Sequence, residues 1–588
     1  MTPATDTYTL LRAFVDELAR CGMRAACTSP GSRNTPLLLS LAREERLRCY
    51  SHVDERCAGF FALGLAKASG LPVAVTCTSG TAVAELLPAV IEAHEARVPL
   101  LLLTADRPPE LRENGAGQAI DQLKLFGGAA KWFFEVGTHD AGPERLRWMR
   151  TLACRAYWTA LEGRPGAVHL NFALREPLVT DEALPPDDTG RPDGRPYVSR
   201  PVTRLVAKSA DGVLEKLLSG AQRGVVVAGR HERNTPLGQV AAEFAHTAGW
   251  PLLADPLSGA RRGPAAVAHY DALLREESFA RWAVPDLVLR VGDLPVSKPL
   301  RAWLASLGDA GLRQVALDPE GAWQDPASVL SDCLAVDPIQ ALTQVADALA
   351  PADEDWLSSW RSADELAAEA MLGVLAESGL SEPAVAAELG VLLPKDATLF
   401  VASSMPVRDI ETFWPARPDP PRTLCNRGAN GIDGTVSSAF GVAAAGEGPV
   451  VLLIGDVALA HDIGGLLAAR RTGLKLTIVL LDNGGGGIFD FLPIAQADTV
   501  EEQIYTTHVS TPTGLDFAQA AALFGLAHEH AQDASGFRSA LERAMEREES
   551  SIVEVRTARA DNVELHRALW QAVSRALNPR GEATTPAT

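Results

Sequence analysis

Long apolar runs are missing from this chain of 588 residues. A membrane-spanning helix needs about 20 consecutive apolar residues, whereas the longest runs, such as residues 100–103 and 450–454, are only as long as a β-strand. The N-terminus carries the acidic Asp6 and lacks the basic segment and apolar core of a signal peptide. We therefore expect neither a membrane-spanning helix nor a secretory signal.

Cysteine spacings typical of zinc sites are absent as well. The eight cysteines form no CxxC pair, which argues against a structural zinc site. Several of them lie inside apolar strand or helix patterns, where a free thiol packs like a small hydrophobic side chain. This cysteine usage is typical of a reduced protein, so we expect a cytoplasmic location.

Positive charge is scarce. The chain has 54 lysine and arginine residues against 74 aspartate and glutamate residues, which gives a formal net charge of −20. Such a chain repels phosphate backbones and anionic lipids, so we expect no nucleic acid and no membrane surface among its partners. Small molecules remain as the expected partners. An anionic small molecule would need a binding site at which arginines are concentrated.

Short apolar strands alternate with amphipathic helices along most of the chain. This alternation predicts an α/β fold with doubly wound parallel sheets. Residues 184–201, rich in proline, aspartate and glycine, predict a linker, and residues 351–354 break the pattern again. The length fits three or four domains. The pattern predicts three, over residues 1–183, 202–350 and 355–578, and a disordered tail over residues 579–588.

The sharpest local signal lies in the predicted third domain. One apolar strand runs into Gly455-Asp456, and a helix and a second apolar strand lead to Asp482-Asn483 and four glycines. Parallel neighbouring strands bring such residues to one edge of the sheet, where open α/β sheets bind ligands. Carboxylate, amide and carbonyl oxygens suit Mg²⁺, and glycines let the backbone approach a diphosphate closely. Each motif alone is a common turn, but together they predict a metal and diphosphate site.

This pattern resembles the signature of thiamine-diphosphate-dependent enzymes, in which Gly-Asp-Gly is followed at a distance by Asn-Asn. The chain departs from it twice, because Val457 replaces the last glycine and Asp482 the first asparagine. The resemblance implies a pyrimidine-binding domain, a central transhydrogenase-like domain and a diphosphate-binding domain. It places Gly455 at the cofactor and assigns Mg²⁺ or Mn²⁺ to Asp456, Asn483 and the carbonyl of Gly485.

The same resemblance implies a glutamate that hydrogen-bonds the aminopyrimidine of the cofactor. The candidate is Glu55, which stands where the predicted strand over residues 48–53 meets the next helix. A carboxyl group there would deliver a proton to the pyrimidine ring, and partial burial would adjust its pKa for that task. The alternative is that Asp54 and Glu55 are only acidic residues that favour the start of a helix.

Further motifs narrow the resemblance. They stand in the first and third domains, at residues 28–36, 52–56, 78–82, 104–110 and 426–434. With them the chain resembles the 2-succinyl-5-enolpyruvyl-6-hydroxy-3-cyclohexene-1-carboxylate synthases of menaquinone biosynthesis, over about residues 8 to 575. That family decarboxylates 2-oxoglutarate on thiamine diphosphate and adds the succinyl carbanion to isochorismate in a Stetter-like conjugate addition.

Both of these substrates are dicarboxylates, and the planar fork of arginine matches a carboxylate. The resemblance assigns substrate binding to Ser32, Arg33, Arg107, Gln118, Lys298, Arg408 and Arg427. The residues that flank Lys298 differ from the family, and Gly117 stands where the family commonly has asparagine. Contacts with the cofactor are implied for Ser404, for Ile432 as an apolar wedge, and for Ile488 and Phe489. Plain core packing is the alternative for the last three.

Other functions stay open at this point. An acetolactate-synthase-like carboligase or decarboxylase would keep Glu55 and Asp456, but pyruvate, a monoanion, would not call for Arg33 or for the pair Arg408 and Arg427. A catalytically silent binding subunit is a second alternative, and the retained Glu55 and Asp456 count against it. No GxGxxG motif supports an NAD-binding enzyme. In the resembling family the glutamate and the metal site belong to different subunits, which implies a homodimer or homotetramer.

Overall fold

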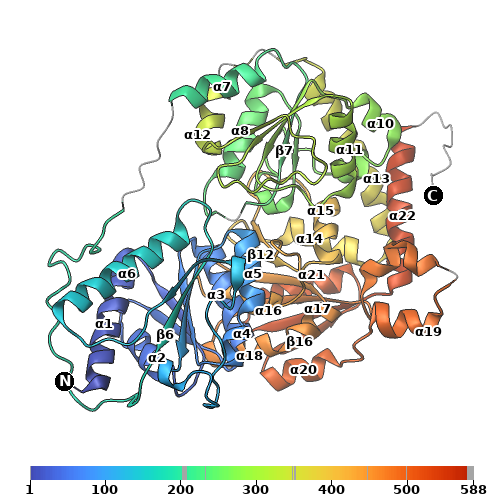
Figure 1. The fold of residues 1–588 in the computed structure, drawn as a ribbon. Helices are drawn as coiled ribbons and strands as arrows, with labels where there is room; N and C mark the ends of the chain where they lie inside the picture. The colour runs from blue at the N-terminus through green and yellow to red at the C-terminus, as the bar shows by residue number, and fades with distance from the viewer. Residues whose placement is uncertain are drawn as a thin grey trace.

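The computed structural model of the chain describes residues 2–200, 208–231, 233–346, 349, 352–446, 448–497 and 499–578. The predicted disordered tail, residues 579–588, lies outside them. Figure 1 shows an N-terminal part in blue, a central part in green and a C-terminal part in orange and red. Each part is built on one parallel sheet, which confirms the predicted fold class. The predicted domain limits stay a prediction.

The first sheet has six strands in the order β2-β1-β3-β4-β6-β5. All five neighbouring pairs are parallel, and helices connect most of the strands. The strands are β1 (Ala25–Thr28), β2 (Arg48–Ser51), β3 (Val73–Cys77), β4 (Leu100–Asp106), β5 (Ala130–Glu135) and β6 (Ala167–Ala173). The helices are α1 (Pro3–Cys21), α2 (Thr35–Ala42), α3 (Glu55–Ser69), α4 (Thr81–Ala84), α5 (Leu87–Ala96) and α6 (Pro143–Leu161).

The central sheet has five parallel strands in the order β11-β10-β9-β7-β8. The strands are β7 (Gly224–Ala228), β8 (Leu252–Ala254), β9 (Leu287–Val291), β10 (Arg313–Leu317) and β11 (Asp332–Leu334). The helices are α7 (Lys208–Leu218), α8 (Leu237–Ala248), α9 (Tyr270–Leu273), α10 (Glu277–Trp282), α11 (Lys298–Asp309) and α12 (Pro338–Val345).

The third sheet has six parallel strands in the order β13-β12-β14-β15-β17-β16. This is the strand order of the first sheet repeated. The strands are β12 (Thr398–Val401), β13 (Arg422–Leu424), β14 (Val450–Gly455), β15 (Thr477–Asp482), β16 (Ala527–Ala531) and β17 (Ser551–Arg556). The helices are α13 (Trp356–Ser378), α14 (Glu382–Leu392), α15 (Met405–Phe413), α16 (Thr435–Ala443), α17 (Asp456–His461), α18 (Leu467–Thr472), α19 (Glu502–Tyr505), α20 (Phe517–Phe524), α21 (Ala534–Glu546) and α22 (Arg559–Leu577).

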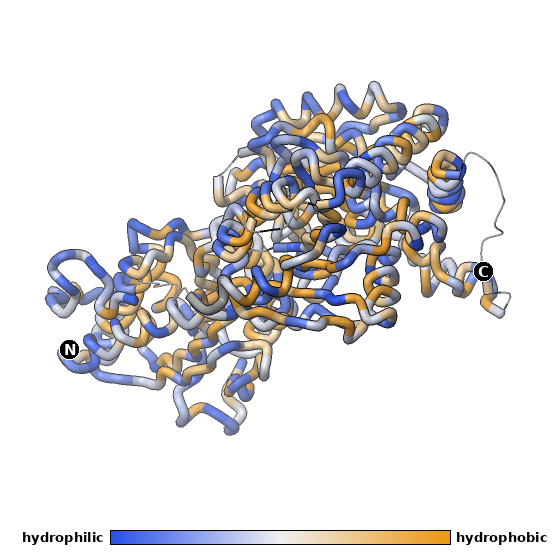
Figure 2. The backbone as a smooth tube through the Cα atoms, turned by 90° about the horizontal axis from the view of Figure 1, so that it is seen from above, coloured by the Kyte–Doolittle hydropathy of each residue, from blue (hydrophilic) through white to orange (hydrophobic). Residues whose placement is uncertain are grey.

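The outer helices carry polar and apolar residues in alternation, as Figure 2 shows along the backbone. This pattern is typical of helices that pack one face on a sheet and turn the other to water. Within the described part of the chain, no helix combines the length and the hydropathy needed to cross a membrane.

Helices α3 and α16 join the first and third domains by packing backbone against backbone near the centre of the molecule (Figure 1). A Cβ atom on Gly64 would lie 1.9 Å from the carbonyl oxygen of Ser438. A Cβ atom on Gly441 would lie 2.0 Å from the carbonyl oxygen of Phe61. The absence of side chains at both glycines therefore sets how closely the two domains approach.

The substitution Gly64→Ala is expected to lower the free energy of unfolding by about 1–3 kcal/mol or more, because the added methyl group must push α3 and α16 apart. Gly373→Ala is the matched control. It lies inside α13 with open space around it, so it should raise the free energy of unfolding by about 0.5–1 kcal/mol. Denaturant-induced unfolding measures both, and a Gly64→Ala protein as stable as the parent would contradict the close approach.

Candidate active site

Two oxygen donors lie at the carboxyl edge of the third sheet. β14 and β15 are parallel neighbours with Gly455 opposite Leu481, so Asp456 and Asn483 follow them at the same edge. Burial, with Asp482 nearby, raises the pKa of Asp456 to about 6. Its Oδ2 atom and the Oδ1 atom of Asn483 are buried and have no hydrogen-bond partner among the described residues. Buried oxygen atoms without a donor are what a cation-binding site would leave.

The loop after β15 carries the four glycines that the sequence places at a diphosphate. Gly485 has a φ of +136°, and a Cβ atom there would lie 2.5 Å from the carbonyl oxygen of Ser510. The N–H of Gly486 donates to this carbonyl at 2.6 Å, and the N–H of Gly485 bonds to the Asp456 carboxylate. Only glycine tolerates both the φ angle and the contact, so the loop is held in one conformation beside Asp456.

Glu382, the first residue of α14, is a site residue that the sequence did not reveal. It is 1% exposed, and its Oε1 atom accepts hydrogen bonds from Nδ2 of Asn483 at 2.9 Å and from the Thr557 hydroxyl at 3.1 Å. Because the amide nitrogen of Asn483 is held in this way, its Oδ1 atom is left for another ligand. The two residues are 101 positions apart, and no local pattern marks the pair.

Three guanidinium groups gather near the start of α15. Ser404 precedes this helix with a φ of +74°, and Arg408 lies one turn into it. Burial, followed by the charges of Arg427 and Arg301, lowers the pKa of Arg408 even though Asp409 is adjacent. Burial and Arg427 also lower the pKa of Arg301. Cations that depress one another's pKa values form a place where a bound anion is favoured.

The central domain reaches this group through α11. Lys298, the residue that the sequence singled out, begins the helix and is exposed. Arg301 stands one turn later, and its charge acts on Arg408. Arg301 is not among the residues predicted from the sequence, although its spacing from Lys298 puts both residues on one side of the helix.

A second group lies at the carboxyl edge of the first sheet. Arg33 donates from Nη1 to the carbonyl of Leu174 at 2.9 Å and from Nη2 to Glu176 at 3.0 Å, and its buried Nε atom has no partner among the described residues. Arg107, which follows β4, donates to the Ser79 hydroxyl. Burial and the nearby Arg33 lower the pKa of Arg107. The structure thus brings the two predicted arginines together.

The predicted Gln118 and Ser32 lie beside these arginines. Gln118 has a φ of +57° and packs on Gly80. A Cβ atom added to Gly80 would lie 3.4 Å from the carbonyl oxygen of Gln118. Ser32 directly precedes Arg33 and is exposed. All four predicted substrate-binding residues of the first domain therefore lie at one edge of its sheet.

A buried polar network supports this edge from inside the sheet. The side chain of Gln122 accepts from the N–H of Gly80 at 3.0 Å and donates to Oδ1 of Asn171 at 2.9 Å. The amide of Asn171 donates to Asp106 at 2.9 Å, one residue before Arg107. Each polar group of this network has a partner, which is the condition for burying it without a large penalty.

His169 lies in the same sheet, fully buried, with Nε2 2.7 Å from the Thr104 hydroxyl. Burial lowers its pKa to about 3. At His169 the unfolded chain therefore binds a proton more readily than the folded one. His169 should leave the free energy of unfolding unchanged above pH 6.5 and should lower it more and more as the pH falls from 6.5 toward 3. At pH 5 we expect about 2 kcal/mol of lost stability from this residue.

Denaturant-induced unfolding at pH 7 and pH 5 measures this loss. His169→Gln should flatten the pH dependence by about 2 kcal/mol, whereas the same change at the exposed His246 should leave the dependence as it is. Parallel pH curves for His169→Gln and the parent protein would refute the assignment.

Glu55 begins α3 at the carboxyl end of β2 and is half-buried. Burial raises its pKa, and the carboxylates of Asp54 and Glu85 add to the rise. Arg56 in the same helical turn forms an ion pair with Asp462 of the third domain at 3.0 Å. Within the described part of the chain, no hydrogen bond or ion pair links Glu55 to Asp456.

Comparison with known proteins places the whole chain. Residues 8–125 match the N-terminal TPP binding domain of thiamine pyrophosphate enzymes, residues 196–401 their middle domain, and residues 407–555 their C-terminal TPP binding domain. A 2-succinyl-5-enolpyruvyl-6-hydroxy-3-cyclohexene-1-carboxylate synthase of Geobacillus kaustophilus is 44% identical, over 96% of this chain and 97% of that protein. The chain belongs to this synthase family.

Two further proteins of the same name support this membership. The synthase of Chloroflexus aurantiacus is 43% identical over 97% of this chain and 97% of that protein. The synthase of Listeria monocytogenes serovar 1/2a is 41% identical over 96% of this chain and 97% of that protein. Strands β1 to β4 of the first sheet lie within the match to the N-terminal TPP binding domain, and β13 to β16 of the third sheet lie within the match to the C-terminal one.

The third domain fits such a cofactor together with a divalent cation. The unpartnered oxygens of Asp456 and Asn483 and the conformation of the Gly485 loop offer hard oxygen donors beside an open backbone. Of the apolar residues, Ile488 is half-buried next to this loop, and Phe489 is 36% exposed. Ile432 packs against the core that contains α3 and α16. The contacts of these three with the cofactor stay a prediction.

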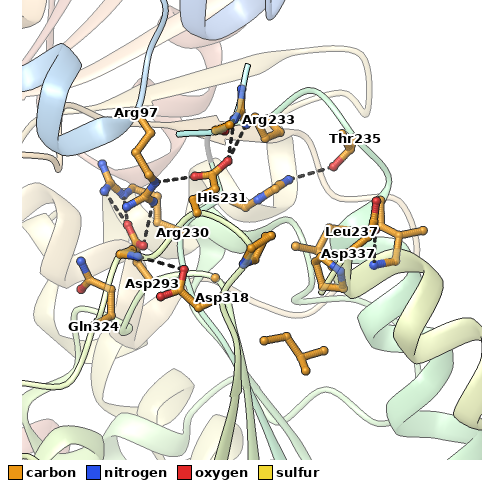
Figure 3. Close-up of a pocket in the computed structure, with 18 of the residues that line it drawn as sticks. Arg97, Arg230, His231, Arg233, Thr235, Leu237, Asp293, Asp318, Gln324 and Asp337 are labelled. Atoms are coloured by element: carbon orange, nitrogen blue, oxygen red, sulfur yellow. Dashed lines mark hydrogen bonds and ion pairs between the residues drawn. The ribbon is translucent and has the colours of Figure 1, made fainter. Parts of the chain in front are cut away.

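A cavity of about 870 Å³ lies elsewhere, between the first domain of this synthase and its central domain (Figure 3). Its arginines are paired with acids: Arg97 with Asp293 at 2.7 Å and with Glu320 at 2.8 Å, and Arg233 with Glu320 at 2.6 Å. None of the site residues predicted from the sequence lines it. The cavity is thus separate from the candidate active site.

Proposed function

We propose that the chain converts 2-oxoglutarate and isochorismate into 2-succinyl-5-enolpyruvyl-6-hydroxy-3-cyclohexene-1-carboxylate, with release of CO₂, as a step of menaquinone biosynthesis. The observation that carries the proposal beyond family membership is the group of Arg301, Arg408 and Arg427 near Ser404. In a chain of net charge −20, such a group favours a ligand that carries several negative charges, as a dicarboxylate does. Pyruvate would leave most of these positive charges without a partner.

The metal and the diphosphate are assigned to the carboxyl edge of the third sheet. Asp456, Asn483 and the carbonyl of Gly485 would hold Mg²⁺ or Mn²⁺. Glu382 would bind the amide nitrogen of Asn483 and so keep its Oδ1 atom turned toward the ion. Thiamine diphosphate, when bound, supplies a carbon nucleophile and an electron sink for decarboxylation. The glycine loop would let the backbone approach the diphosphate, and Ser404 and Gly455 would lie beside the cofactor.

Glu55 is assigned the proton transfer. A carboxyl group whose pKa is raised by burial holds its proton closer to neutral pH, so it can share that proton with the ring nitrogen of an aminopyrimidine. General acid–base catalysis of this kind requires hydrogen-bonding distance and a pKa near the working pH.

The substrate carboxylates are assigned to the two arginine groups. Arg408 and Arg427 would bind a carboxylate from the cofactor side, with Lys298 reaching in from the central domain. Ser32, Arg33, Arg107 and Gln118 would hold isochorismate at the edge of the first sheet. The pKa depression that Arg33 causes at Arg107 would be relieved when an anion binds between them.

The assembly is assigned as a homodimer or homotetramer with the sites at the subunit interface. The turn that carries Glu55 is tied to its own third domain through Arg56 and Asp462, yet Glu55 itself makes no contact of this kind with Asp456. A second subunit would supply the missing half. The cytoplasmic location expected from the cysteine usage completes the proposal.

Consumption of 2-oxoglutarate by the purified protein, with thiamine diphosphate and Mg²⁺, tests the reaction. We expect consumption that depends on isochorismate and no turnover of pyruvate. Turnover of pyruvate alone would replace the proposal by an acetolactate-synthase-like reaction. Cofactor binding without turnover of any 2-oxo acid would indicate a silent binding subunit.

A further inference from the structure

The loop that carries Arg427 is held from both sides by two charged side chains of the first domain. This loop, residues 425–430, follows β13 in the third domain. Lys67 comes from α3 and Glu92 from α5, two helices that pack on each other (Figure 1). Lys67 is 1% exposed and Glu92 is 3% exposed, so neither is an ordinary surface charge.

The hydrogen bonds of this pair bracket Arg427. Nζ of Lys67 donates to Oε1 of Glu92 at 3.2 Å and to the carbonyl of Cys425 at 2.7 Å. Glu92 accepts the N–H of Gly428 at 2.9 Å on Oε1 and the N–H of Ala429 at 2.7 Å on Oε2. One charge therefore fixes the backbone before Arg427, and the other fixes it directly after.

Gly428 is fitted to this arrangement. A Cβ atom there would lie 2.7 Å from the N atom of Ala96, 2.8 Å from the carbonyl oxygen of Glu92 and 2.9 Å from its Oε2 atom. Two of these are backbone atoms of α5, which cannot rotate away. The glycine is therefore what allows the carboxylate to reach both N–H groups.

The guanidinium of Arg427 has no hydrogen bond or ion pair with the residues that the structure describes. Its position is set by the backbone of its loop, while its charge acts on Arg408. A buried ion pair is costly to desolvate and adds little net stability. Both charges of this pair bond to the backbone of the loop that carries Arg427, so the pair can place that loop.

We propose that Lys67 and Glu92 are positioning residues that aim Arg427 at a substrate carboxylate. The inference rests on the proposed role of Arg427 in substrate binding. It gives the first domain a part in recognition of the substrate that the third domain binds, through contacts within the same chain.

A double-mutant cycle on the full-length protein with cofactor and Mg²⁺ tests this. Steady-state kinetics first identify the substrate whose KM rises in Arg427→Ala. Glu92→Gln should raise KM for that same substrate about 10- to 100-fold, because a displacement of about 1 Å of a binding group has this effect, and should change kcat less. In the Arg427→Ala background, Glu92→Gln should raise this KM less than about threefold, because the effects of coupled residues are not additive.

Two further variants separate positioning from a loss of stability. Gly428→Ala keeps both buried charges but pushes the loop from α5, and it should reproduce the rise in KM. Arg150→Met breaks a buried pair with Glu17 (2.7 Å) in the same domain, with no contact to the loop, and should leave KM unchanged while it lowers stability. The proposal would be overturned if Glu92→Gln raised KM equally with and without Arg427, or if Arg150→Met raised KM.

Hydrogen exchange supplies a readout that does not depend on the reaction. In the intact protein the amides of Gly428 and Ala429 should exchange at least about tenfold faster in Glu92→Gln than in the parent protein, because each loses a charged acceptor. Unchanged exchange at these amides would refute the clamp itself. If exchange changes but no substrate is turned over, the proposed reaction is what fails.

Discussion

Replacing Glu55 by glutamine is expected to lower kcat for isochorismate-dependent consumption of 2-oxoglutarate by about 10²–10⁴-fold, the usual range for loss of a general acid–base group. Glutamine keeps the size and the hydrogen-bonding capacity of the side chain, but it has no proton to share with a ring nitrogen. The half-buried position and the raised pKa of Glu55 suit a group that holds this proton.

Asp54→Asn is the matched control, because it changes the neighbouring carboxylate. Asp54 caps α3 by accepting the N–H of Cys57 at 3.1 Å, and asparagine caps a helix about as well as aspartate. Burial, the largest cause of the raised pKa of Glu55, stays the same in this variant, so its kcat should stay within about twofold of the parent value. A loss in Asp54→Asn equal to that in Glu55→Gln, or full activity of Glu55→Gln, would remove Glu55 from the proton transfer.

The sequence predicts the architecture well where strands are apolar throughout. The strand patterns that indicate three parallel sheets include those of β4, β14 and β15, whose residues are buried along nearly their whole length. Edge strands are harder to predict. β16 reads Ala-His-Glu-His-Ala and is mostly half-exposed, and β13 and β11 have three residues each. Pairing with a neighbour, rather than an intrinsic preference, makes these segments strands.

The site divides in the same way. Asp456, Asn483 and Glu55 follow strands and can be found from local patterns, because the carboxyl ends of parallel strands are where ligands bind. Glu382 and Glu92 reach the site through contacts across 101 and 336 positions of the chain. A glutamate at a helix start or inside a helix is common, so only the folded structure separates these two from ordinary ones.

Asp456→Ala is expected to weaken the binding of thiamine diphosphate about 100-fold or more and to abolish turnover. The carboxylate is the charged ligand of the assigned metal site, and removal of even an outer partner of a metal ligand costs about 10- to 100-fold in affinity. Isothermal titration calorimetry measures the effect. The protein is titrated with thiamine diphosphate once in the presence of Mg²⁺ and once in the presence of EDTA. The parent protein in EDTA should resemble Asp456→Ala in Mg²⁺.

Two other variants change residues that lie near the assigned ion but do not bind it, and their cofactor affinities are compared with that of Asp456→Ala. Asp482→Asn restores the asparagine that is usual in the signature and should bind the cofactor as the parent protein does. Glu382→Leu leaves the Asn483 amide without its acceptor and should weaken binding about 10- to 100-fold. Affinity that is the same with Mg²⁺ and with EDTA would contradict the metal site. Equal losses in all three variants would indicate damage to the loop rather than removal of a ligand, because only Asp456 contributes a charged oxygen directly.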